Sequence, residues 1–405
     1  MEKIDIKYKD YKKKSDIHGT ILYPAVMIAP MQKEILKDTM REMKINSIFD
    51  PFHGSGTALY ECAELSNEIN LYGCDINPLA NLITKVKFQG TDDANIDNDI
   101  EQLISKIKQN EYDKTFYFNN IDKWFREDIK EDLKKIRSSI ISIQNTKNRL
   151  YFWYMLCDLI RKYSNTRSST YKLHIKKQTA IMKMRNNLIN DFIKAIKENK
   201  NKFKKRDNRL VLFKTDILKK IVEFDKNTFD IAITSPPYGD NVTTVPYGQF
   251  SMLSLYWIDS KDLELEGWEL ENYSKIDGES LGGIANKIEI AENDRKYIQQ
   301  YINRIDNKKI KKVERFFSDY FKFLKEITRI TRNRIIMTLG NRTVDGININ
   351  LTDITIRYLE EHNFKNNIVM EREIPVKRLP RKTSKVNNQS VNSMNYEYVI
   401  IHDKI

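Results

Sequence analysis

Strand-like and helix-like patterns alternate along this chain of 405 residues, and that alternation restricts the folds open to it. Short apolar runs end at turns rich in Gly, Pro or Asp, and stretches with helical spacing follow most of them. The strand patterns lie at residues 45–49, 71–75, 209–214, 229–234, 334–339, 367–373 and 397–402. Strands that alternate with helices favour an α/β fold with a doubly wound parallel sheet, in which ligands sit at the carboxyl ends of the strands.

A long helical stretch, from about residue 92 to residue 205, interrupts the alternation after the second strand pattern. Apolar residues recur there at helical spacing, as in Ile96, Ile100, Leu103 and Ile107. We therefore expect an α/β unit into which a helical block is inserted. The expected segments are residues 1–90, 91–205 and 206–405, with the helical block in the middle.

The net charge of the chain, +13, comes almost entirely from one segment. Residues 147–209 hold 18 basic and 4 acidic residues, a net charge of +14, whereas residues 1–90 are neutral and residues 210–405 carry +2. A solvated helix face usually mixes signs, and this segment does not. The imbalance predicts contact with a polyanion, and the backbone of DNA or RNA is the first candidate.

Two stretches inside the basic segment are suited to phosphate contacts. Residues 164–172 combine hydroxyls with cations in an expected loop, although an ordinary polar turn between helices explains the same composition. A second cluster, which we also expect to touch phosphate, consists of Lys202, Lys204, Lys205 and Arg206.

Two further stretches near the C-terminal half have unusual charge. Residues 376–385 form a basic turn, which fits either DNA binding or a solvated loop. Residues 255–294 hold 3 basic and 11 acidic residues, a net charge of −8. This acidic stretch is typical of a lid or of a subunit surface, and the sequence does not choose between them.

Asp50-Pro-Phe-His-Gly-Ser-Gly-Thr57 follows the first strand pattern and precedes a helical pattern. A Gly loop of this kind brings backbone N–H groups close to a ligand at a helix N-terminus. It lacks the Lys of the phosphate-binding loop GxxxxGK[ST], which argues against a nucleotidase. Asp75, at the end of the next strand pattern, can accept hydrogen bonds from two ribose hydroxyls. Together they indicate a nucleoside ligand without a pyrophosphate. S-adenosyl-L-methionine fits better than NAD, because Asp50 can face its cationic portion.

Thr234-Ser-Pro-Pro-Tyr-Gly-Asp-Asn241 follows another strand pattern. Two adjacent prolines remove two N–H donors and hold the chain extended. The Ser235 hydroxyl and the Pro236 carbonyl then become neighbouring acceptors for the two N–H groups of an exocyclic amine. Tyr238 offers a ring on which a base can stack. Such acceptors bias an aromatic amine toward a tetrahedral nitrogen, whose lone pair can attack a methyl sulfonium in line.

These motifs together resemble the site-specific DNA amino-methyltransferases of restriction–modification systems, which use S-adenosyl-L-methionine. Residues 50–57 resemble the family's cofactor loop, and residues 235–238 resemble its catalytic tetrapeptide. Residues 23–30, after His18-Gly19, are similar to the segment that closes over the methionine end of the cofactor. Asp216 stands where the family contacts the adenine of the cofactor. The resemblance covers about 1–90 and 206–405, and it implies a Rossmann-like sheet whose helical insertion recognises the target.

The resemblance also implies a set of site residues and partners. The expected catalytic residues are Ser235, Pro236, Pro237 and Tyr238. The expected cofactor-binding residues are Tyr23, Pro24, Asp50, Pro51, Phe52, Gly54, Ser55, Gly56, Thr57, Asp75 and Asp216. The expected substrate is double-stranded DNA, with the target base flipped out of the helix. A cognate restriction endonuclease is the expected protein partner.

The amine that accepts the methyl group follows from the first residue of the tetrapeptide. Enzymes of the resembled family with Ser in that position are most often cytosine-N4 methyltransferases, and those with Asp or Asn most often act on adenine N6. Ser235 therefore favours cytosine N4, with adenine N6 as the alternative. Guanine N2 of structured RNA and a non-catalytic nucleic-acid-binding protein are further alternatives. Methylation at cytosine C5 would need a Cys nucleophile, normally after Pro, and no Cys here follows a Pro.

Several other classes are excluded by what the sequence lacks. No stretch approaches about 18 uncharged apolar residues, so we expect no membrane protein. Residues 1–14 lack the apolar core of a signal peptide, and the three cysteines form no CxxC pair, so we expect a cytoplasmic protein. No set of His, Cys, Asp and Glu has metal-ligand spacing, and we expect no metal. The aromatic residues of the helical block are expected in its core, namely Trp124, Phe125, Phe152, Trp153 and Tyr154.

Overall fold

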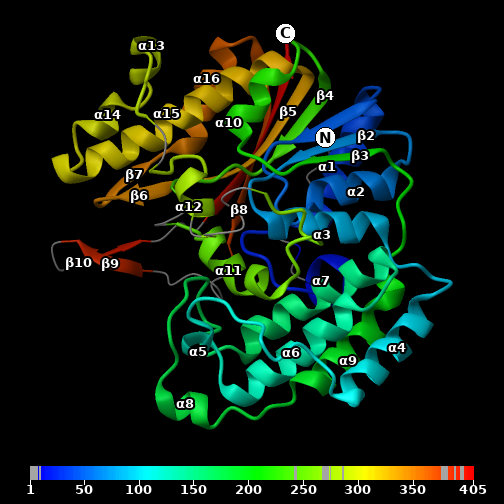
Figure 1. Ribbon diagram of the computed structural model, residues 1–405. Coiled ribbons are helices and arrows are strands. Elements are labelled where there is room, and N and C mark those ends of the chain that lie inside the picture. The colour runs from blue at the N-terminus through cyan, green and yellow to red at the C-terminus, as the bar shows by residue number, and fades with distance from the viewer. Residues whose placement is uncertain are drawn as a thin grey trace.

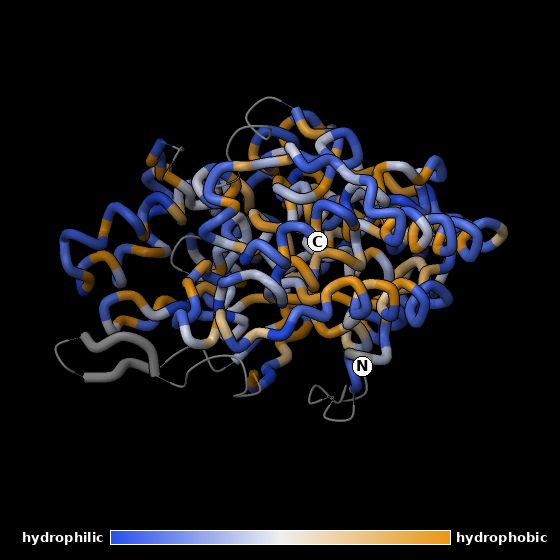
Figure 2. Tube along the Cα trace, turned by 60° about the horizontal axis from the view of Figure 1, so that its bottom comes forward, coloured by the Kyte–Doolittle hydropathy of each residue, from blue (hydrophilic) through white to orange (hydrophobic). Residues whose placement is uncertain are grey.

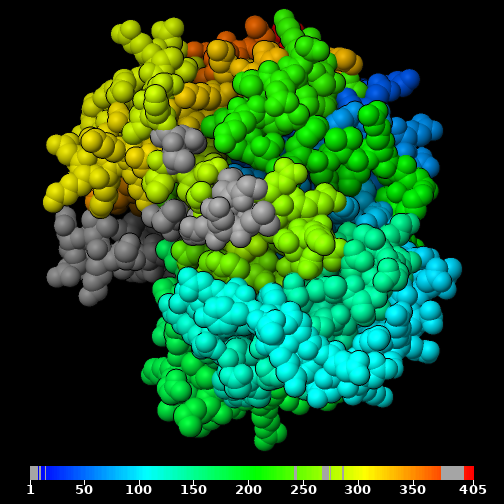
Figure 3. Space-filling view, in the orientation of Figure 1, coloured from blue at the N-terminus to red at the C-terminus, as the bar shows by residue number. Residues whose placement is uncertain are grey.

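The computed structural model describes residues 8, 11–240, 244–266, 273, 275–284, 287–374, 382–386, 389–392 and 396–405, the two short ranges from 382 to 392 for their backbone alone. A twisted sheet with helices on both faces forms one part of the molecule, and a block of helices lies beside it (Figure 1). In the space-filling view this helical block forms the lower part of the face shown (Figure 3). The expected α/β fold with a Rossmann-like sheet is confirmed.

Seven strands form the central sheet in the order β3-β2-β1-β4-β5-β11-β8. Their bounds are β1 Ser47–Asp50, β2 Asn70–Cys74, β3 Leu210–Phe213, β4 Phe229–Thr234, β5 Thr331–Gly340, β8 Phe364–Glu373 and β11 Tyr396–Lys404. The strands from β3 to β5 are parallel, but β11 runs antiparallel to both of its neighbours. The sheet is therefore mostly parallel, as expected, with one antiparallel strand, β11, next to the edge strand β8. No helix connects β8 to β11 among the described residues, and a parallel pair needs such a crossover.

Helices cover both faces of the sheet. One face carries α1 Ala29–Glu42, α2 Thr57–Leu65 and α3 Pro78–Gln89, and the other carries α10 Ile217–Lys220, α15 Asn307–Ile330 and α16 Leu351–Glu361. Residues of β5 alternate between the two cores, because successive side chains of a strand point to opposite faces. Ile336 belongs to the first core, and Ile335 and Met337 belong to the second. This arrangement is the doubly wound sheet that the alternating patterns predict.

The helical block follows α3 in the chain and precedes β3. Its helices are α4 Ile96–Gln109, α5 Ile121–Trp124, α6 Glu127–Ile141, α7 Thr146–Tyr163, α8 Gln178–Met182 and α9 Leu188–Asn199. Residues 164–177 lack a helix and contain an isolated bridge between Thr166 and Ile175. The five aromatic residues expected in its core are all buried, as predicted. The block shares one hydrophobic core with the α1–α3 face of the sheet.

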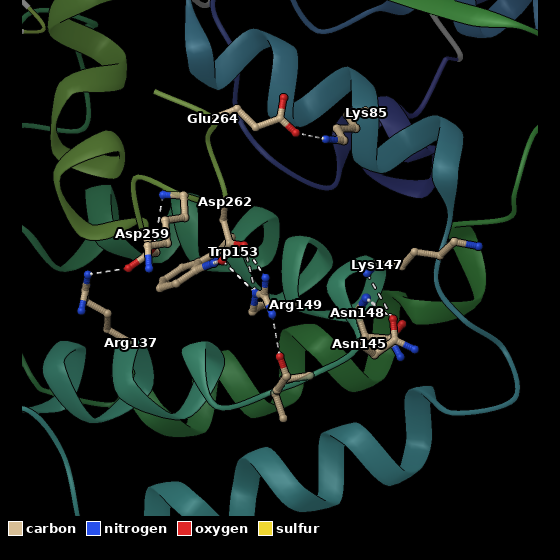
Figure 4. A network of polar contacts seen from close by, with 12 residues as sticks. Lys85, Arg137, Asn145, Lys147, Asn148, Arg149, Trp153, Asp259, Asp262 and Glu264 are labelled. Carbon is tan, nitrogen blue, oxygen red and sulfur yellow. Dashed lines mark hydrogen bonds and ion pairs between the residues drawn. The ribbon is translucent and has the colours of Figure 1, made fainter. Parts of the chain in front are cut away.

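Part of the acidic stretch 255–294 ties the α/β unit to the helical block (Figure 4). It follows α11 Tyr247–Trp257 and continues into α12 Lys275–Glu279. Arg149 of α7 makes a two-pronged ion pair with Asp262, whose carboxylate also accepts a hydrogen bond from the Trp153 ring N–H at 2.7 Å. Asp259 pairs with Arg137 of α6 at 3.2 Å, and Glu264 pairs with Lys85 of α3 at 2.7 Å. These three carboxylates thus form ion pairs within the chain.

The remaining elements are short. They are α13 Glu292–Arg295, α14 Gln299–Ile302, β6 Arg342–Val344, β7 Ile347–Ile349, β9 Lys382–Val386 and β10 Gln389–Asn392. Residues 376–381 of the expected basic turn lie outside the described residues, and the side chains of the rest of it are not described. Apolar residues gather toward the interior of the chain trace, and outer helices alternate polar and apolar residues (Figure 2). No helix of the described residues has both the length and the apolar character needed to cross a membrane.

Candidate active site

The loop between β1 and α2 depends on two glycines. Gly54 and Gly56 have φ values of +51° and +70°, a left-handed backbone conformation that favours glycine. A Cβ at Gly56 would also lie 2.6 Å from the side chain of Thr84, so a larger residue does not fit there. Gly56 stands just before the first turn of α2 and directs the chain from the strand into that helix. The strand, Gly loop and helix predicted at 45–65 are confirmed.

A cavity of about 800 Å³, including its open mouth, lies at the carboxyl ends of β1, β2, β3 and β4. Its lining includes many of the residues predicted from sequence, namely Tyr23, Pro24, Pro51, Phe52, Gly54, Ser55, Thr57, Asp75, Asp216, Ser235 and Pro237. The cofactor loop and the catalytic tetrapeptide, about 180 residues apart in sequence, therefore face one cavity. Four predicted residues do not line it, namely Asp50, Gly56, Pro236 and Tyr238.

Asp75 joins the loop after β1 to the loop after β2, at the carboxyl ends of these two strands. One carboxylate oxygen accepts a hydrogen bond from the Gly54 N–H at 3.0 Å, and the other accepts from the Asn77 N–H at 2.8 Å. Burial raises the pKa of Asp75, and the two N–H donors favour its charged form. Each oxygen keeps a further lone pair for a ligand hydroxyl. Asp75 thus organises the site as well as facing it.

Asp50 lies beneath the cavity wall rather than in it. Its side chain is fully buried, and one oxygen accepts a hydrogen bond from the Phe52 N–H at 3.1 Å. The other oxygen has no hydrogen bond of normal geometry within the described part of the chain, although the nearby Thr234 hydroxyl favours the charged form. Burial raises the pKa of Asp50 to about 7. A buried carboxylate with a spare oxygen fits a cationic ligand close to the loop.

Asp216 follows β3 and stands at the start of α10. Its carboxylate accepts a hydrogen bond from the Leu218 N–H at 3.0 Å and so caps that helix. Only 8% of the residue is exposed, and burial raises its pKa. The second oxygen remains for a donor in the cavity, such as an amine on a heteroaromatic ring.

Ser235 and Tyr238 hydrogen-bond to each other across the catalytic turn. The Ser235 Oγ lies 3.0 Å from the Tyr238 Oη. Tyr238 is half-buried and packs against the core that includes Val313, Phe316 and Phe317 of α15. It does not line the cofactor-facing cavity, and its role as a stacking surface for the base stays a prediction. Pro236 is buried behind Ser235.

Asp240 fixes the far end of the same turn. Its carboxylate forms ion pairs with Lys312 of α15 at 3.2 Å and with Arg342 of β6 at 3.0 Å. Gly239 lies directly under the Arg342 side chain, where an added Cβ would be 2.2 Å from a guanidinium nitrogen. The turn is thereby held from its Ser235 end to its Asp240 end.

Several lining residues were not predicted from sequence. Asn77 caps α3, and its side-chain amide donates to the Tyr23 hydroxyl at 3.2 Å and to Ser251 at 2.7 Å. The Asn77-Pro78 pair is a helix-start signal that could have identified it. Ile276, Ser280 and Leu281 close another wall, from inside the acidic stretch. No local pattern marks these three, because only the tertiary fold brings α12 over the loop.

The exposed cations of the helical block and of the segment that follows it differ in whether they have a side-chain partner. Arg167, Lys177, Lys183 and Arg185 are exposed and make no side-chain hydrogen bond or ion pair with any described residue. Their loop contacts α11, because Leu173 N–H donates to Gln249 and the ring of Tyr171 packs on Phe250. By contrast, Arg206 pairs with Glu64. Lys202, Lys204, Lys205 and Arg206 also precede β3, at the end of the sheet opposite the cavity.

The lining residues fit S-adenosyl-L-methionine. Carboxylates stand at the ends of β2 and β3, a third carboxylate with a spare oxygen underlies the Gly loop, and apolar side chains supply the walls. No group of three or more His, Cys, Asp or Glu arranged for a metal ion occurs among the described residues. This sheet, with a Gly loop and Ser-Pro-Pro-Tyr at neighbouring strand ends, defines a Rossmann-like methyltransferase.

Comparison with known proteins narrows that class. No family model matches the chain. It is 31% identical over 419 residues to the type II methyltransferase M.MvaI of Kocuria varians, and the alignment covers 95% of this chain and 90% of that protein. It is 34% identical over 94 residues to the type II methyltransferase M.MjaII of Methanocaldococcus jannaschii, covering 23% of this chain and 17% of that protein. The chain belongs to the type II methyltransferases, the site-specific DNA methyltransferases of restriction–modification systems.

Proposed function

We propose that this protein methylates the exocyclic N4 amine of cytosine in duplex DNA. The observation that carries the proposal is Ser235, the first residue of the tetrapeptide, on the wall of the cavity that the Gly loop also lines. A neutral hydroxyl in that position favours the cytosine amine, as the family resemblance implies. Adenine N6 remains the second candidate, because its amine presents the same two N–H groups.

S-adenosyl-L-methionine is the proposed methyl donor, and when bound it supplies the methyl group as an electrophilic sulfonium. Asp75 offers lone pairs to the ribose hydroxyls and Asp216 to the adenine amine. Tyr23 and Pro24 line the cavity beside Gly54 of the Gly loop. Asp50 lies beneath Pro51 and Phe52, where its negative charge favours a cation in the cavity.

The catalytic turn orients the target amine. We propose that the Ser235 hydroxyl and the Pro236 carbonyl accept its two hydrogens, which turns the nitrogen lone pair toward the cavity. The Ser235 Oγ and the Tyr238 Oη lie 3.0 Å apart, and either hydroxyl can donate. We propose that Tyr238 donates when the target amine is bound, so that a lone pair of Ser235 Oγ faces the amine. A base paired inside a duplex cannot reach this turn, so the target cytosine must be flipped out.

The helical block is proposed to hold the DNA. The exposed loop with Arg167, Lys177, Lys183 and Arg185 lies beside α11, the helix that follows the catalytic turn, and its cations are free to meet phosphates. Residues 202–206 are a weaker candidate, because the cavity opens at the other end of the sheet. We also propose that a cognate restriction endonuclease is the other enzyme of the same restriction–modification system.

The substrate class is tested with purified protein and methyl-labelled S-adenosyl-L-methionine. Duplex DNA, single-stranded DNA and structured RNA of matched sequence are offered separately, with the Ser235→Ala variant as the control. We expect label in duplex DNA from the wild-type protein alone. Label confined to RNA would overturn the proposal in favour of an RNA methyltransferase, and label in none of them would favour a binding protein.

A further inference from the structure

A buried cation stands behind the cofactor loop, outside the cavity. Lys87 of α3 is 1% exposed, and its ammonium donates a hydrogen bond to the Ser55 carbonyl at 2.7 Å. That bond orients the peptide between Ser55 and Gly56, whose N–H donates to the His53 carbonyl at 2.7 Å. Lys87 therefore fixes the tightest part of the Gly loop from underneath.

A neutral imidazole links this cation to a buried carboxylate. The Lys87 Nζ lies 3.1 Å from the His18 Nδ1, and the His18 Nε2 lies 2.8 Å from Glu61 Oε1. Burial lowers the pKa of Lys87 to about 7 and raises that of Glu61 to about 7. When Lys87 is charged, its ammonium has donors only, so Nδ1 accepts and the ring hydrogen sits on Nε2, where it points at Glu61. Burial lowers the pKa of His18 well below its usual value, which agrees with a neutral ring. The series Lys87–His18–Glu61 is thus connected by hydrogen bonds while only 4% of His18 and 6% of Glu61 are exposed.

The three residues join three parts of the site. His18 belongs to the N-terminal segment that continues into Tyr23 and Pro24 at the cavity wall. Glu61 belongs to α2, and Lys87 belongs to α3. None of the three lines the cavity itself. The network therefore ties the Gly loop to α2 and to the segment that leads into Tyr23 and Pro24.

Stability alone gives a poor reason for this network. Removing an ammonium and a carboxylate from water is unfavourable, and well-packed apolar residues of similar size usually stabilise a core as well or better. A buried, hydrogen-bonded polar network is instead suited to holding backbone groups in one geometry. The group that it holds is the Ser55 carbonyl, in a residue that lines the cavity.

We propose that Lys87, His18 and Glu61 are positioning residues for the cofactor loop. They set the affinity for S-adenosyl-L-methionine without touching it, and the inference rests on the proposed cofactor. Loss of the Lys87 ammonium leaves the Ser55 carbonyl without its partner, so the loop samples conformations that do not bind. Cofactor affinity then falls, whereas turnover at saturating cofactor and affinity for DNA stay nearly unchanged.

The test compares Lys87→Met with Lys85→Met, a matched control two residues away on the same helix. Lys85 is exposed and pairs with Glu264 at the surface. Dissociation constants for S-adenosyl-L-methionine and S-adenosylhomocysteine are measured by calorimetry, and kcat and KM are measured with duplex DNA. We expect Lys87→Met to raise both dissociation constants and the cofactor KM at least tenfold, with kcat at saturating cofactor within about threefold. Lys85→Met should match the wild-type protein, and Lys87→Arg should recover part of the affinity.

The outcomes separate the two proposals. If the wild-type protein binds neither ligand, S-adenosyl-L-methionine is not the cofactor and the proposed function is wrong. A wild-type protein that binds them, together with a folded Lys87→Met variant of equal affinity, defeats the positioning role alone. If Lys87→Met does not fold, the Glu61→Gln variant tests the positioning role instead. It keeps the shape of the Glu61 side chain and removes its charge. A threefold or greater rise in cofactor KM supports the network, and an unchanged KM overturns it.

Discussion

Ser235 is the residue whose hydroxyl faces the reacting amine in the proposed site, and its removal gives the sharpest result. Ser235→Ala takes away one of two acceptors and leaves the cavity walls in place. Loss of one preorganised hydrogen-bonding group costs on the order of 10²–10³ in kcat. We expect methyl transfer to fall at least that far while cofactor affinity stays within twofold. Wild-type turnover by this variant would show that Ser235 does not act on the amine.

Tyr238 is expected to act through Ser235. Tyr238→Phe keeps the ring packed against α15 and removes the hydroxyl that lies 3.0 Å from Ser235 Oγ. The serine hydroxyl is then free to rotate, so kcat should fall about tenfold with little change in cofactor KM. Steady-state kinetics on duplex DNA measure this. An unchanged kcat would mean that the hydroxyl pair has no part in the reaction.

Asp50 should make cofactor binding depend on pH. Its pKa is raised to about 7 by burial, so the carboxyl keeps its proton below that pH and is charged above it. A charged Asp50 attracts the sulfonium of S-adenosyl-L-methionine and does not favour the uncharged thioether of S-adenosylhomocysteine. Between pH 6 and pH 8 the preference for the sulfonium should rise severalfold, as measured by calorimetry with both ligands.

Asp50→Asn is the control for that prediction. Glu61 and Lys87 also have pKa values shifted to about 7, so a pH effect alone does not identify the group. In the Asn variant the ratio of the two dissociation constants should be flat from pH 6 to pH 8. A ratio that still changes with pH would assign the effect to another group.

Sequence predicts which residues form the site better than it predicts where each side chain lies. Asp75 was expected from its position at a strand end and Asp216 from the family resemblance, and both line the cavity. Tyr238 was expected to offer its ring to a base, and the sequence gives no sign that it also packs against the core to which α15 contributes, about 80 residues later. Lys87 carries no local signal, because its partners His18 and Ser55 come from distant parts of the chain. Contacts between distant segments are absent from any local pattern.

Among the elements, the contact between α7 and the segment after α11 should contribute most to holding the helical block. Asp262 has a side chain 5% exposed and pairs with Arg149. Arg149→Met leaves that carboxylate with the Trp153 N–H as its remaining side-chain donor in Figure 4. We expect a loss of about 2–3 kcal/mol in the free energy of unfolding, measured with urea.

The exposed pair of Lys85 and Glu264 is the comparison for this element. Exposed ion pairs contribute about 0–1 kcal/mol, so Lys85→Met should change the free energy of unfolding by no more than about 1 kcal/mol. The double variant Arg149→Met with Asp262→Asn should recover part of the stability, because it no longer buries an unpaired charge. If Arg149→Met and Lys85→Met lower the free energy of unfolding equally, the Arg149–Asp262 pair does not have this stabilising role.

The loop 164–187 should carry the salt-dependent part of DNA binding. Replacing Arg167, Lys177, Lys183 and Arg185 with Gln removes up to four phosphate contacts, and each contact contributes about 0.9 to the slope of log affinity against log salt. We expect the slope to fall by about two to four. The matched control replaces Lys202, Lys204 and Lys205 with Gln, and its slope should stay close to the wild-type value. The reverse result would place the DNA at the other end of the sheet.

At the level of elements, the sequence patterns identify most strands and helices, with β4 at its predicted bounds. They do not give strand direction. The antiparallel β11 could have been predicted, because no helical pattern separates the strand patterns at 367–373 and 397–402. The position of α12 over the cavity could not have been predicted, because its residues show no periodic apolar pattern that would place it near the Gly loop.

For the whole molecule, the distribution of charge agrees with the arrangement of its parts. The α/β unit that carries the cavity is close to neutral, and the net charge of +14 lies within residues 147–209. Part of that charge is used in internal ion pairs such as Arg149 with Asp262, and the unpaired part is exposed on the loop beside α11. The molecule thus combines a nearly neutral α/β unit with a basic loop, which we propose meets the DNA backbone.

The identity of the methylated base tests the central proposal most directly. DNA from cells that express the protein is digested to nucleosides and analysed by mass spectrometry, with cells that express Ser235→Ala as the control. We predict N4-methylcytosine in the first sample and none in the second. N6-methyladenine without N4-methylcytosine in the wild-type sample would contradict the assignment to cytosine N4.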